Sequence, residues 1–251
     1  MWICIVCLAF IYEIIDSATG QGYGTLSTPT LMLLGFNALY IVPCVLVSQA
    51  LSGFVGGMIH HKIGNFDVKN NIKDRVNTEI LVVLGCIGVL VGVYVLSKLP
   101  SIIISTYIGV LVVIMGIIIV VGFTFHYSKI RMVIISVFAC FNKGLSGGGY
   151  GPVSTGGQLV LGSEIKNAVG VTTIAEAPIC ITGFIMWCIL NNHLPPFDLL
   201  SATVIGALFA PLIGARITKV AHTKFGNKFT KIIGVIILIL GVYTLYKIFN
   251  Y

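Results

Sequence analysis

The sequence predicts an all-α polytopic membrane protein built from two inverted repeats within a single transmembrane domain. Of its 251 residues, 57% are hydrophobic and only 9% are charged, whereas about a quarter of the residues in soluble domains are charged. Apolar runs of about 20 residues, the length of a membrane-spanning helix, recur along the chain, and a Gly-rich string occurs twice. No polar stretch is long enough to form an independent soluble domain.

Six of the apolar runs predict continuous spans. They cover residues 36–59, 80–97, 102–125, 168–190, 199–217 and 229–249. Residues 1–35 and 131–162 differ, because each contains an apolar stretch, a break rich in Gly, Ser and Thr, and a shorter apolar stretch. Gly and Pro destabilise helix interiors, so we expect breaks at residues 16–29 and 143–155. Each segment is then a hairpin of broken helices.

The two interrupted segments are copies of each other. Adding 127 to a residue number in the first copy gives its counterpart in the second. Eight of the sixteen positions from Gly20 to Gly35 are identical without a gap. The identical pairs are Gly20/Gly147, Gly22/Gly149, Tyr23/Tyr150, Gly24/Gly151, Ser27/Ser154, Thr28/Thr155, Leu34/Leu161 and Gly35/Gly162. The chain therefore divides into repeats at residues 1–125 and 126–251.

The positions of the basic residues predict that the repeats are inverted. If each hairpin were a single crossing, the basic loops at residues 60–79 and 218–228 would face opposite sides, against the tendency of Lys and Arg to stay cytoplasmic. If each hairpin enters and returns on one side, every repeat has three crossings, and both loops share a side. We therefore expect these loops to be cytoplasmic in the cell membrane, with both chain termini outside.

The remaining composition excludes several function classes. The 15 Lys and Arg against 8 Asp and Glu lie in gaps between apolar runs, which indicates membrane topology rather than nucleic-acid binding. No nucleotide-binding, zinc-protease or serine-hydrolase motif occurs, so we expect no enzyme activity, cofactor or metal. The seven cysteines lie in apolar segments and are expected to act as small hydrophobic residues, although Cys4 and Cys7 leave a metal or redox role open.

The two breaks predict an anion site near the middle of the membrane. Irregular backbone at that depth is tolerated only where it is buried or lines a cavity, and broken helices in inverted repeats hold substrates in transporters. Half-helices starting at Thr25 and Pro152 would present positive N-termini. The predicted substrate-binding residues are Gly22, Tyr23, Gly24, Ser27, Thr28, Gly149, Tyr150, Gly151, Ser154 and Thr155. The alternative is that the glycines only permit close helix packing.

Lys143 is the charged residue that we expect to meet the anion. It lies 12 residues past Arg131, about 18 Å into a hydrocarbon core about 30 Å thick, where ionisable groups mark function or pairing. Its counterpart is Asp16, so the alternative is a structural Asp16–Lys143 ion pair.

Glu176 lies in the middle of a predicted span, and its counterpart is Gln49. The Glu176 carboxylate is predicted either to carry a coupling proton or to serve as a fixed counter-charge for Lys143. Glu13, three residues before Asp16, is expected near an entrance. His60 lies at the end of a span and is expected at the water interface.

Several strings resemble one known family. Gly147-Gly-Gly-Tyr-Gly-Pro152, Leu161-Gly162, Asn167-Ala-Val-Gly-Val-Thr-Thr173 and Ala175-Glu176-Ala177 are similar to the sulfite exporter TauE/SafE family of membrane permeases. The resemblance extends over the whole chain in layout and is most specific from Lys143 to Gly183. It implies ion-coupled secondary transport of sulfite, sulfonates or related sulfur-containing anions.

The function predicted is therefore a permease for small sulfur-containing anions, whose partners are the substrate and the lipid bilayer. A passive anion channel, a transporter of another cargo such as a metal ion, and a membrane-embedded enzyme or assembly subunit are the alternatives. No oligomeric state is predicted.

Overall fold

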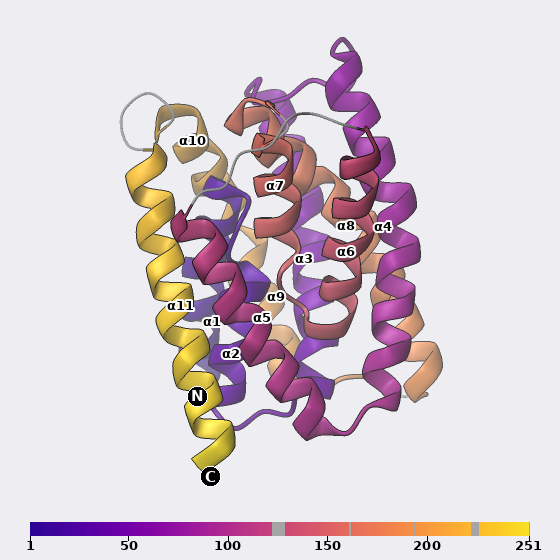
Figure 1. The fold of residues 1–251 in the computed structure, drawn as a ribbon, viewed down its shortest axis with the longest axis vertical. Coiled ribbons are helices and arrows are strands. Elements are labelled where there is room, and N and C mark those ends of the chain that lie inside the picture. Colours follow the sequence, from indigo (N-terminus) through magenta and orange to yellow (C-terminus); the bar gives the residue numbers. More distant parts are fainter. Residues whose placement is uncertain (122–128, 161, 193, 222–225, 251) are drawn as a thin grey trace.

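The computed structural model describes residues 1–121, 129–160, 162–192, 194–221 and 226–250. These ranges contain helices and short connections but no strand (Figure 1), so the predicted all-α class is confirmed. The helices are α1 (Trp2–Thr19), α2 (Tyr23–Leu33), α3 (Ala38–Lys62), α4 (Ile72–Lys98), α5 (Ser101–Val121), α6 (Lys129–Ser146), α7 (Tyr150–Val160), α8 (Ile165–Asn191), α9 (Phe197–Leu208), α10 (Pro211–Ala221) and α11 (Gly226–Asn250).

Six helical stretches among the described residues are long and apolar enough to cross a membrane. They are Trp2–Thr19, Ala38–Lys62, Ile72–Lys98, Ser101–Val121, Ile165–Asn191 and Phe197–Lys219, and Gly234–Asn250 of α11 is a shorter apolar helix. Helix α4 begins eight residues before the predicted span at residues 80–97, because Asn71 Oδ1 accepts hydrogen bonds from the backbone N–H groups of Lys73 and Asp74 and so caps the helix. Residues 122–125 of another predicted span lie outside the described residues.

The predicted span at residues 199–217 lies within the membrane-crossing stretch Phe197–Lys219, and a turn interrupts this stretch. Helix α9 ends at Leu208 and α10 begins at Pro211. Proline has no backbone N–H and disfavours helical backbone in the residue before it. The chain therefore turns at Phe209 and Ala210 before the second helix starts.

The breaks in the two hairpins are shorter than predicted. Helices α1 and α6 end only at Thr19 and Ser146, and α2 and α7 begin at Tyr23 and Tyr150, two residues before the predicted starts. Gly20 adopts left-handed backbone, with φ 68°, and ends α1, as glycine commonly does. Pro152 is tolerated in α7 because the first-turn N–H groups of a helix have no helical acceptor.

The chain termini and the connections between helices lie at the two ends of the bundle. Both chain termini lie at the lower end in Figure 1, with the α4–α5 connection, whereas the α3–α4 connection lies at the upper end. Lys73 Nζ donates to the carbonyl of Gly162 at 3.2 Å, and Lys219 Nζ donates to the carbonyl of Ile63 at 3.2 Å. The basic segments after α3 and at the end of α10 therefore lie at the same end of the molecule.

Each half of the chain packs chiefly against the other half. Helix α1 packs against α9 and α10, and α6 packs against α4. Helix α3 packs against α8, and α5 packs against α11. The α5–α11 contact is close because glycines lie on both helices: Gly116 faces Leu238, and Gly241 faces Val113. Small residues permit such close packing in membranes.

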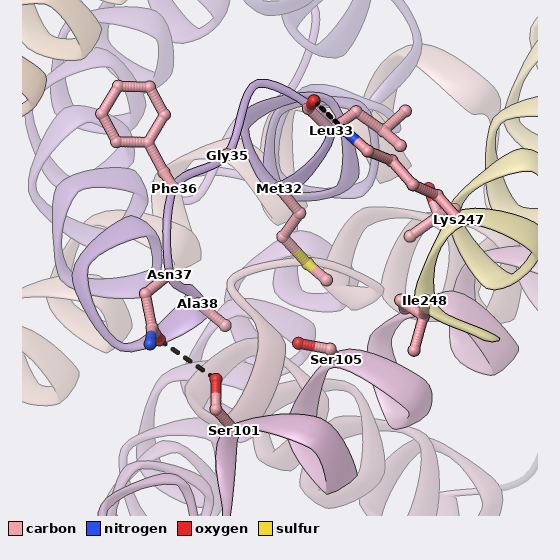
Figure 2. Close-up of a pocket in the computed structure, with 11 residues that line it drawn as sticks. Met32, Leu33, Gly35, Phe36, Asn37, Ala38, Ser101, Ser105, Lys247 and Ile248 are labelled. Atoms are coloured by element: carbon pink, nitrogen blue, oxygen red, sulfur yellow. Dashed lines mark hydrogen bonds between the residues drawn. The ribbon is translucent and has the colours of Figure 1, made fainter. Parts of the chain in front are cut away.

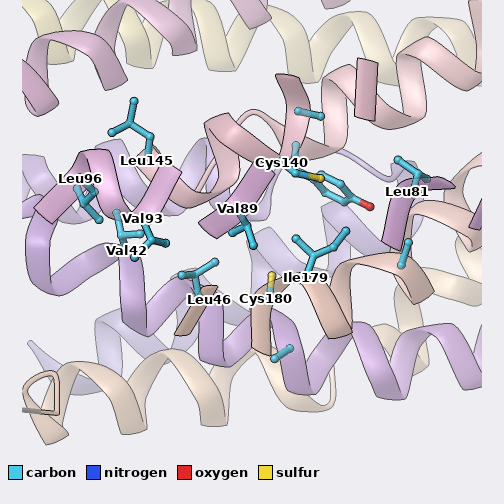
Figure 3. Close-up of a cluster of buried hydrophobic side chains, with 14 of the residues drawn as sticks. Val42, Leu46, Leu81, Val89, Val93, Leu96, Cys140, Leu145, Ile179 and Cys180 are labelled. Carbon is cyan, nitrogen blue, oxygen red and sulfur yellow. The ribbon is translucent and has the colours of Figure 1, made fainter. Parts of the chain in front are cut away.

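The largest apolar core lies between α3, α4, α6 and α8 (Figure 3). Leu46, Val89, Cys140 and Ile179 are among its fully buried members. Large aliphatic side chains such as Ile239 are exposed on the outside of the bundle. In a bilayer these outward side chains meet lipid tails, so the fold needs no polar surface there.

Candidate functional site

The tips of the two hairpins meet through their backbones. A Cβ atom added at Gly24 would collide with the carbonyl group of Gly147, and one added at Gly151 would collide with the carbonyl oxygen of Gly20. Gly149 N–H also donates to Thr25 Oγ1 at 3.1 Å. Only glycine lets the two irregular segments approach this closely, so the duplicated Gly-Tyr-Gly string has a packing role at this crossing.

The contacts at the crossing are reciprocal. Gly24 meets Gly147, and their counterparts, Gly151 and Gly20, meet each other. A Cβ added at Gly147 would lie 3.1 Å from Thr28 Oγ1, and its counterpart Thr155 Oγ1 donates to the carbonyl of Gly20 at 3.0 Å. Residues that lie 127 positions apart in the sequence therefore make equivalent contacts at the crossing.

Lys143, Glu176 and Gln49 form one buried polar cluster. Lys143 Nζ donates to Glu176 Oε1 at 2.6 Å and to Gln49 Oε1, and Gln49 Nε2 donates to Glu176 Oε1 at 2.8 Å. The three residues are 1%, 4% and 2% exposed, respectively. Gln49 and Glu176, which are separated by the same 127 positions as the identical residues of the two tips, are in direct contact.

This cluster lies deep within the bundle. Glu176 is the eleventh residue after the start of α8, and Gln49 is the eleventh after the start of α3, about 17 Å along each helix. Lys143 Nζ also lies 5.8 Å from the centre of the Tyr150 ring, within the range of a cation–π interaction. The Lys143–Glu176 ion pair therefore lies about halfway along helices that would cross a hydrocarbon core about 30 Å thick.

Asp16 is placed differently from its counterpart Lys143. Its Oδ1 atom accepts the backbone N–H of Tyr23 at 3.2 Å, which puts a carboxylate at the N-terminus of α2. Among the described residues, the ion pair of Lys143 is with Glu176. In the described structure the Glu176 carboxylate therefore pairs with the Lys143 ammonium, and no Asp16–Lys143 ion pair occurs among these residues.

The N-terminus of α7 has no equivalent carboxylate, because Lys143 occupies the position that corresponds to Asp16. Tyr150 and Gly151 provide first-turn N–H groups, and Pro152 has none. The positive end of the helix dipole and the Lys143 ammonium thus lie on the same hairpin tip. This combination favours an anion.

The four predicted hydroxyl groups differ between the tips. Ser154 Oγ donates to the carbonyl of Tyr150 at 2.7 Å, and Thr155 Oγ1 contacts both the carbonyl of Gly20 and Thr172 Oγ1 at 3.0 Å. Ser27 Oγ and Thr28 Oγ1 are buried without a hydrogen-bond partner in the described structure. Ser27 and Thr28 could therefore donate to a ligand without breaking a hydrogen bond, whereas Ser154 and Thr155 could not.

The two predicted tyrosines are buried and act as anchors. Tyr23 OH accepts from Ser48 Oγ at 2.9 Å and donates to the carbonyl of Thr203 at 3.4 Å. Tyr150 OH donates to the carbonyl of Thr172 at 3.2 Å. Each hydroxyl group thus fixes the start of its half-helix to a neighbouring helix.

Two of the expectations about charged residues were wrong. Glu13 is buried rather than near an entrance, and it lies beside Ser52 of α3. His60 is buried rather than at the water interface, because its Nε2 contacts the carbonyl of Ser17 at 3.0 Å and its Nδ1 contacts Asn65. The three-residue spacing of Glu13 and Asp16 was the signal available for Glu13, because it places both carboxylates on one helix face.

A separate cavity of about 320 Å³ lies near the end of α2, between α5 and α11 (Figure 2). Lys247 Nζ donates to the carbonyl of Leu33 at 2.7 Å, and Ser101 Oγ donates to Asn37 Oδ1 at 3.4 Å. None of the residues predicted for the substrate site lines it. Cys4 and Cys7 are exposed on α1, apart from the buried cluster.

A bundle of membrane-crossing helices around two meeting broken-helix tips, with a buried ion pair beside them, defines a multi-pass membrane permease. A model of the family described as "Sulfite exporter TauE/SafE" matches residues 5–244. The chain therefore belongs to this family of membrane transporters.

The chain is also similar to a curated bacterial protein, "Probable membrane transporter protein YtnM" of Bacillus subtilis (strain 168). The two are 26% identical over 223 residues, which cover 81% of this chain and 71% of the relative. No solved structure matches the chain.

Proposed function

We propose that this permease moves sulfite or another small sulfur-containing anion by secondary transport, and that the anion binds at the second hairpin tip. The observation that carries the proposal is the Lys143 ammonium, 1% exposed and held by Glu176 and Gln49 beside the N-terminus of α7. Membership of the sulfite exporter family supports the same substrate class.

Lys143 has donor capacity for a ligand in this arrangement. An ammonium group carries three N–H donors, and its contacts within the described residues, to Glu176 and Gln49, use two. Ser27 and Thr28 of the first tip offer hydroxyl donors without partners. An oxyanion between the tips would accept hydrogen bonds from both repeats.

The proposal includes two inverted repeats with the basic end of the bundle in the cytoplasm and both termini outside. The reciprocal tip contacts and the contact between counterparts Gln49 and Glu176 support a pseudo-two-fold axis through the site. The shared end of the basic segments after α3 and in α10 supports the orientation, since cytoplasmic loops carry an excess of Lys and Arg.

Flux into proteoliposomes tests the proposed function. Sulfite, sulfate, thiosulfate and a small sulfonate are compared in vesicles with and without the protein. We expect saturable flux of at least one of them, and Lys143→Gln should lower that flux at low substrate concentration about 10- to 100-fold, because a hydrogen bond to a charged group is lost.

The matched control is Lys166→Gln, since Lys166 pairs with Glu164 on the exposed surface and should leave flux unchanged. Flux of none of the four anions through folded wild-type protein would refute the proposed substrate class. Flux that Lys143→Gln leaves at the wild-type level would refute the assigned site.

A further inference from the structure

Glu13 and Asp16 of α1 lie close to Lys143 and Glu176, and together these four buried residues contain more acidic than basic groups. Glu13, Asp16 and Glu176 are 2%, 8% and 4% exposed, and Lys143 is the ammonium among them. The charges of Glu176 and Lys143 act on both Glu13 and Asp16. Three carboxylates and one ammonium would give the ionised cluster a formal charge of −2, which is strongly unfavourable in a medium of low dielectric constant.

The excess negative charge lies on α1. Glu176 is balanced by Lys143 at 2.6 Å. Asp16 accepts the backbone N–H of Tyr23, and Glu13 Oε2 is buried without a hydrogen-bond partner in the described structure. Like charges three residues apart on a helix also repel each other.

We propose that Glu13 and Asp16 form a proton-binding site, distinct from the Lys143–Glu176 pair, and that the state with both groups protonated is the one that binds the anion. This inference rests on the proposed transport of an anion. With both groups protonated, the cluster has no formal net charge, and the repulsion of an incoming anion is removed. Because protons and anion bind to the same state, they would cross the membrane together as a symport.

The other titratable groups around Glu13 and Asp16 lie on the neighbouring helices α2, α3, α6, α8, α9 and α10. Tyr23 of α2, Cys180 and Glu176 of α8 and Lys143 of α6 act on Glu13 or Asp16. His60 of α3 contacts Ser17, next to Asp16. On the helices that cover α1, Asp198 of α9 and Arg216 and Lys219 of α10 are exposed.

A proton fits the site better than a metal cation. Hard cations take about six or more oxygen ligands, whereas no group of three or more His, Cys, Asp or Glu residues in the described structure is arranged to hold a metal ion. A proton needs only one carboxylate oxygen, such as the unpartnered Glu13 Oε2.

The first test needs no substrate. Infrared spectra of the wild-type protein in lipid nanodiscs at neutral pH should contain the carbonyl-stretching band of protonated carboxylic acids. The band should lose about half its intensity in Glu13→Gln or Asp16→Asn, and nearly all in the double variant. Glu79→Gln is the control, because Glu79 is exposed and paired with Arg75. Absence of the band in wild-type protein, or an unchanged band in both single variants, overturns the proposal.

The second test measures coupling with sulfite as the probe. Across an imposed gradient of one pH unit, sulfite should accumulate in the compartment of higher pH about tenfold per coupled proton, relative to vesicles without protein. In the double variant this accumulation should fall to less than twofold while flux down a sulfite gradient persists. Wild-type accumulation that follows a sodium gradient instead of the pH gradient overturns the proton assignment.

The two tests separate this inference from the proposed function. A protonated-carboxyl band that responds to Glu13→Gln, together with no flux of sulfite, supports the proton site and refutes sulfite as the substrate. Sulfite flux that is indifferent to pH in wild-type protein refutes proton coupling but leaves the anion permease in place.

Discussion

The two hairpin tips have the same backbone conformation but different charged side chains. Gly20 and its counterpart Gly147 have φ angles of 68° and 71°, and both end a helix in the same way. At the charged position, however, the first tip carries Asp16 and the second carries Lys143. The first tip adds a buried Glu13 where the second has Cys140.

The sequence identity between the tips therefore includes the glycines of the crossing but not the charged positions. The glycine contacts require the same backbone in both copies, because each tip packs against the other. The side chains facing the cluster are not constrained in that way. The first tip is acidic and has unpartnered hydroxyl groups in the described structure, whereas the second tip is basic and its hydroxyl groups are hydrogen-bonded.

The largest effect that separates the tips is expected for their charged counterparts. Lys143→Met should lower the free energy of unfolding by about 3–5 kcal/mol, because it leaves the Glu176 carboxylate buried without its cation. Asp16→Asn should change it by less than about 1 kcal/mol, since the amide oxygen can still accept the Tyr23 N–H. Denaturant unfolding in detergent measures both values.

A double variant distinguishes lost pairing from a general packing defect. Lys143→Met with Glu176→Gln should recover most of the stability that Lys143→Met loses, because no unpaired charge remains. If Lys143→Met and Asp16→Asn destabilise the protein equally, the two tips are electrostatically equivalent and the comparison fails.

Sequence periodicity and composition predicted the fold class and the position of most helices. They could not locate the break before Pro211, because the surrounding residues are as apolar as those of an unbroken span. The hairpin breaks were predicted too long for a related reason. Ser, Thr and Gly near the tips are weak helix formers in isolation, but tertiary contacts of the two tips keep α2 and α7 helical from Tyr23 and Tyr150.

The sequence indicated three residues of the buried Lys143–Glu176–Gln49 cluster but not which of them contact each other. Lys143 and Glu176 were identified from their depth in apolar segments, and Gln49 was identified as the counterpart of Glu176. Depth along a helix does not determine which neighbouring helix a side chain faces, so the partner of Lys143 stayed open. Helices α9 and α10, which pack against α1, lie far from it in the sequence, so the three-residue spacing of Glu13 and Asp16 could indicate a shared helix face but not the burial of that face.

A smaller effect should appear at the glycines of the crossing. Gly24→Ala and Gly151→Ala should each lower the free energy of unfolding by about 1–3 kcal/mol through overpacking, because the added Cβ meets the backbone of the opposite tip. Similar losses at these two counterparts would show that the tips are equivalent as scaffold. Thermal unfolding in detergent compares them.

Gly156→Ala is the matched control in α7. A Cβ at Gly156 meets nothing within 4 Å, and Ala is favoured over Gly in a helix by roughly 0.5–1 kcal/mol. This variant should therefore be neutral or slightly stabilising. If it is as harmful as Gly151→Ala, then helix substitution in general, rather than the crossing, explains the losses.

The smallest expected effect concerns the threonine counterparts. Thr155→Val should cost about 1–2 kcal/mol of unfolding free energy, because the carbonyl of Gly20 and Thr172 lose a hydrogen-bond partner. Thr28→Val should cost nothing or stabilise the protein slightly, since it removes a buried hydroxyl that has no partner. The two substitutions have the same shape, so size differences do not enter the comparison.

Transport should show the opposite order for these two variants. If Thr28 is kept unpaired to bind the anion, Thr28→Val should lower sulfite flux at low concentration by roughly tenfold, the effect of about one hydrogen bond, despite its intact stability. Thr155→Val should lower flux less, provided that measurements are made on folded protein. Equal stability losses with equal flux would mean that both hydroxyls are structural, and the substrate would then have to be held by the second tip alone.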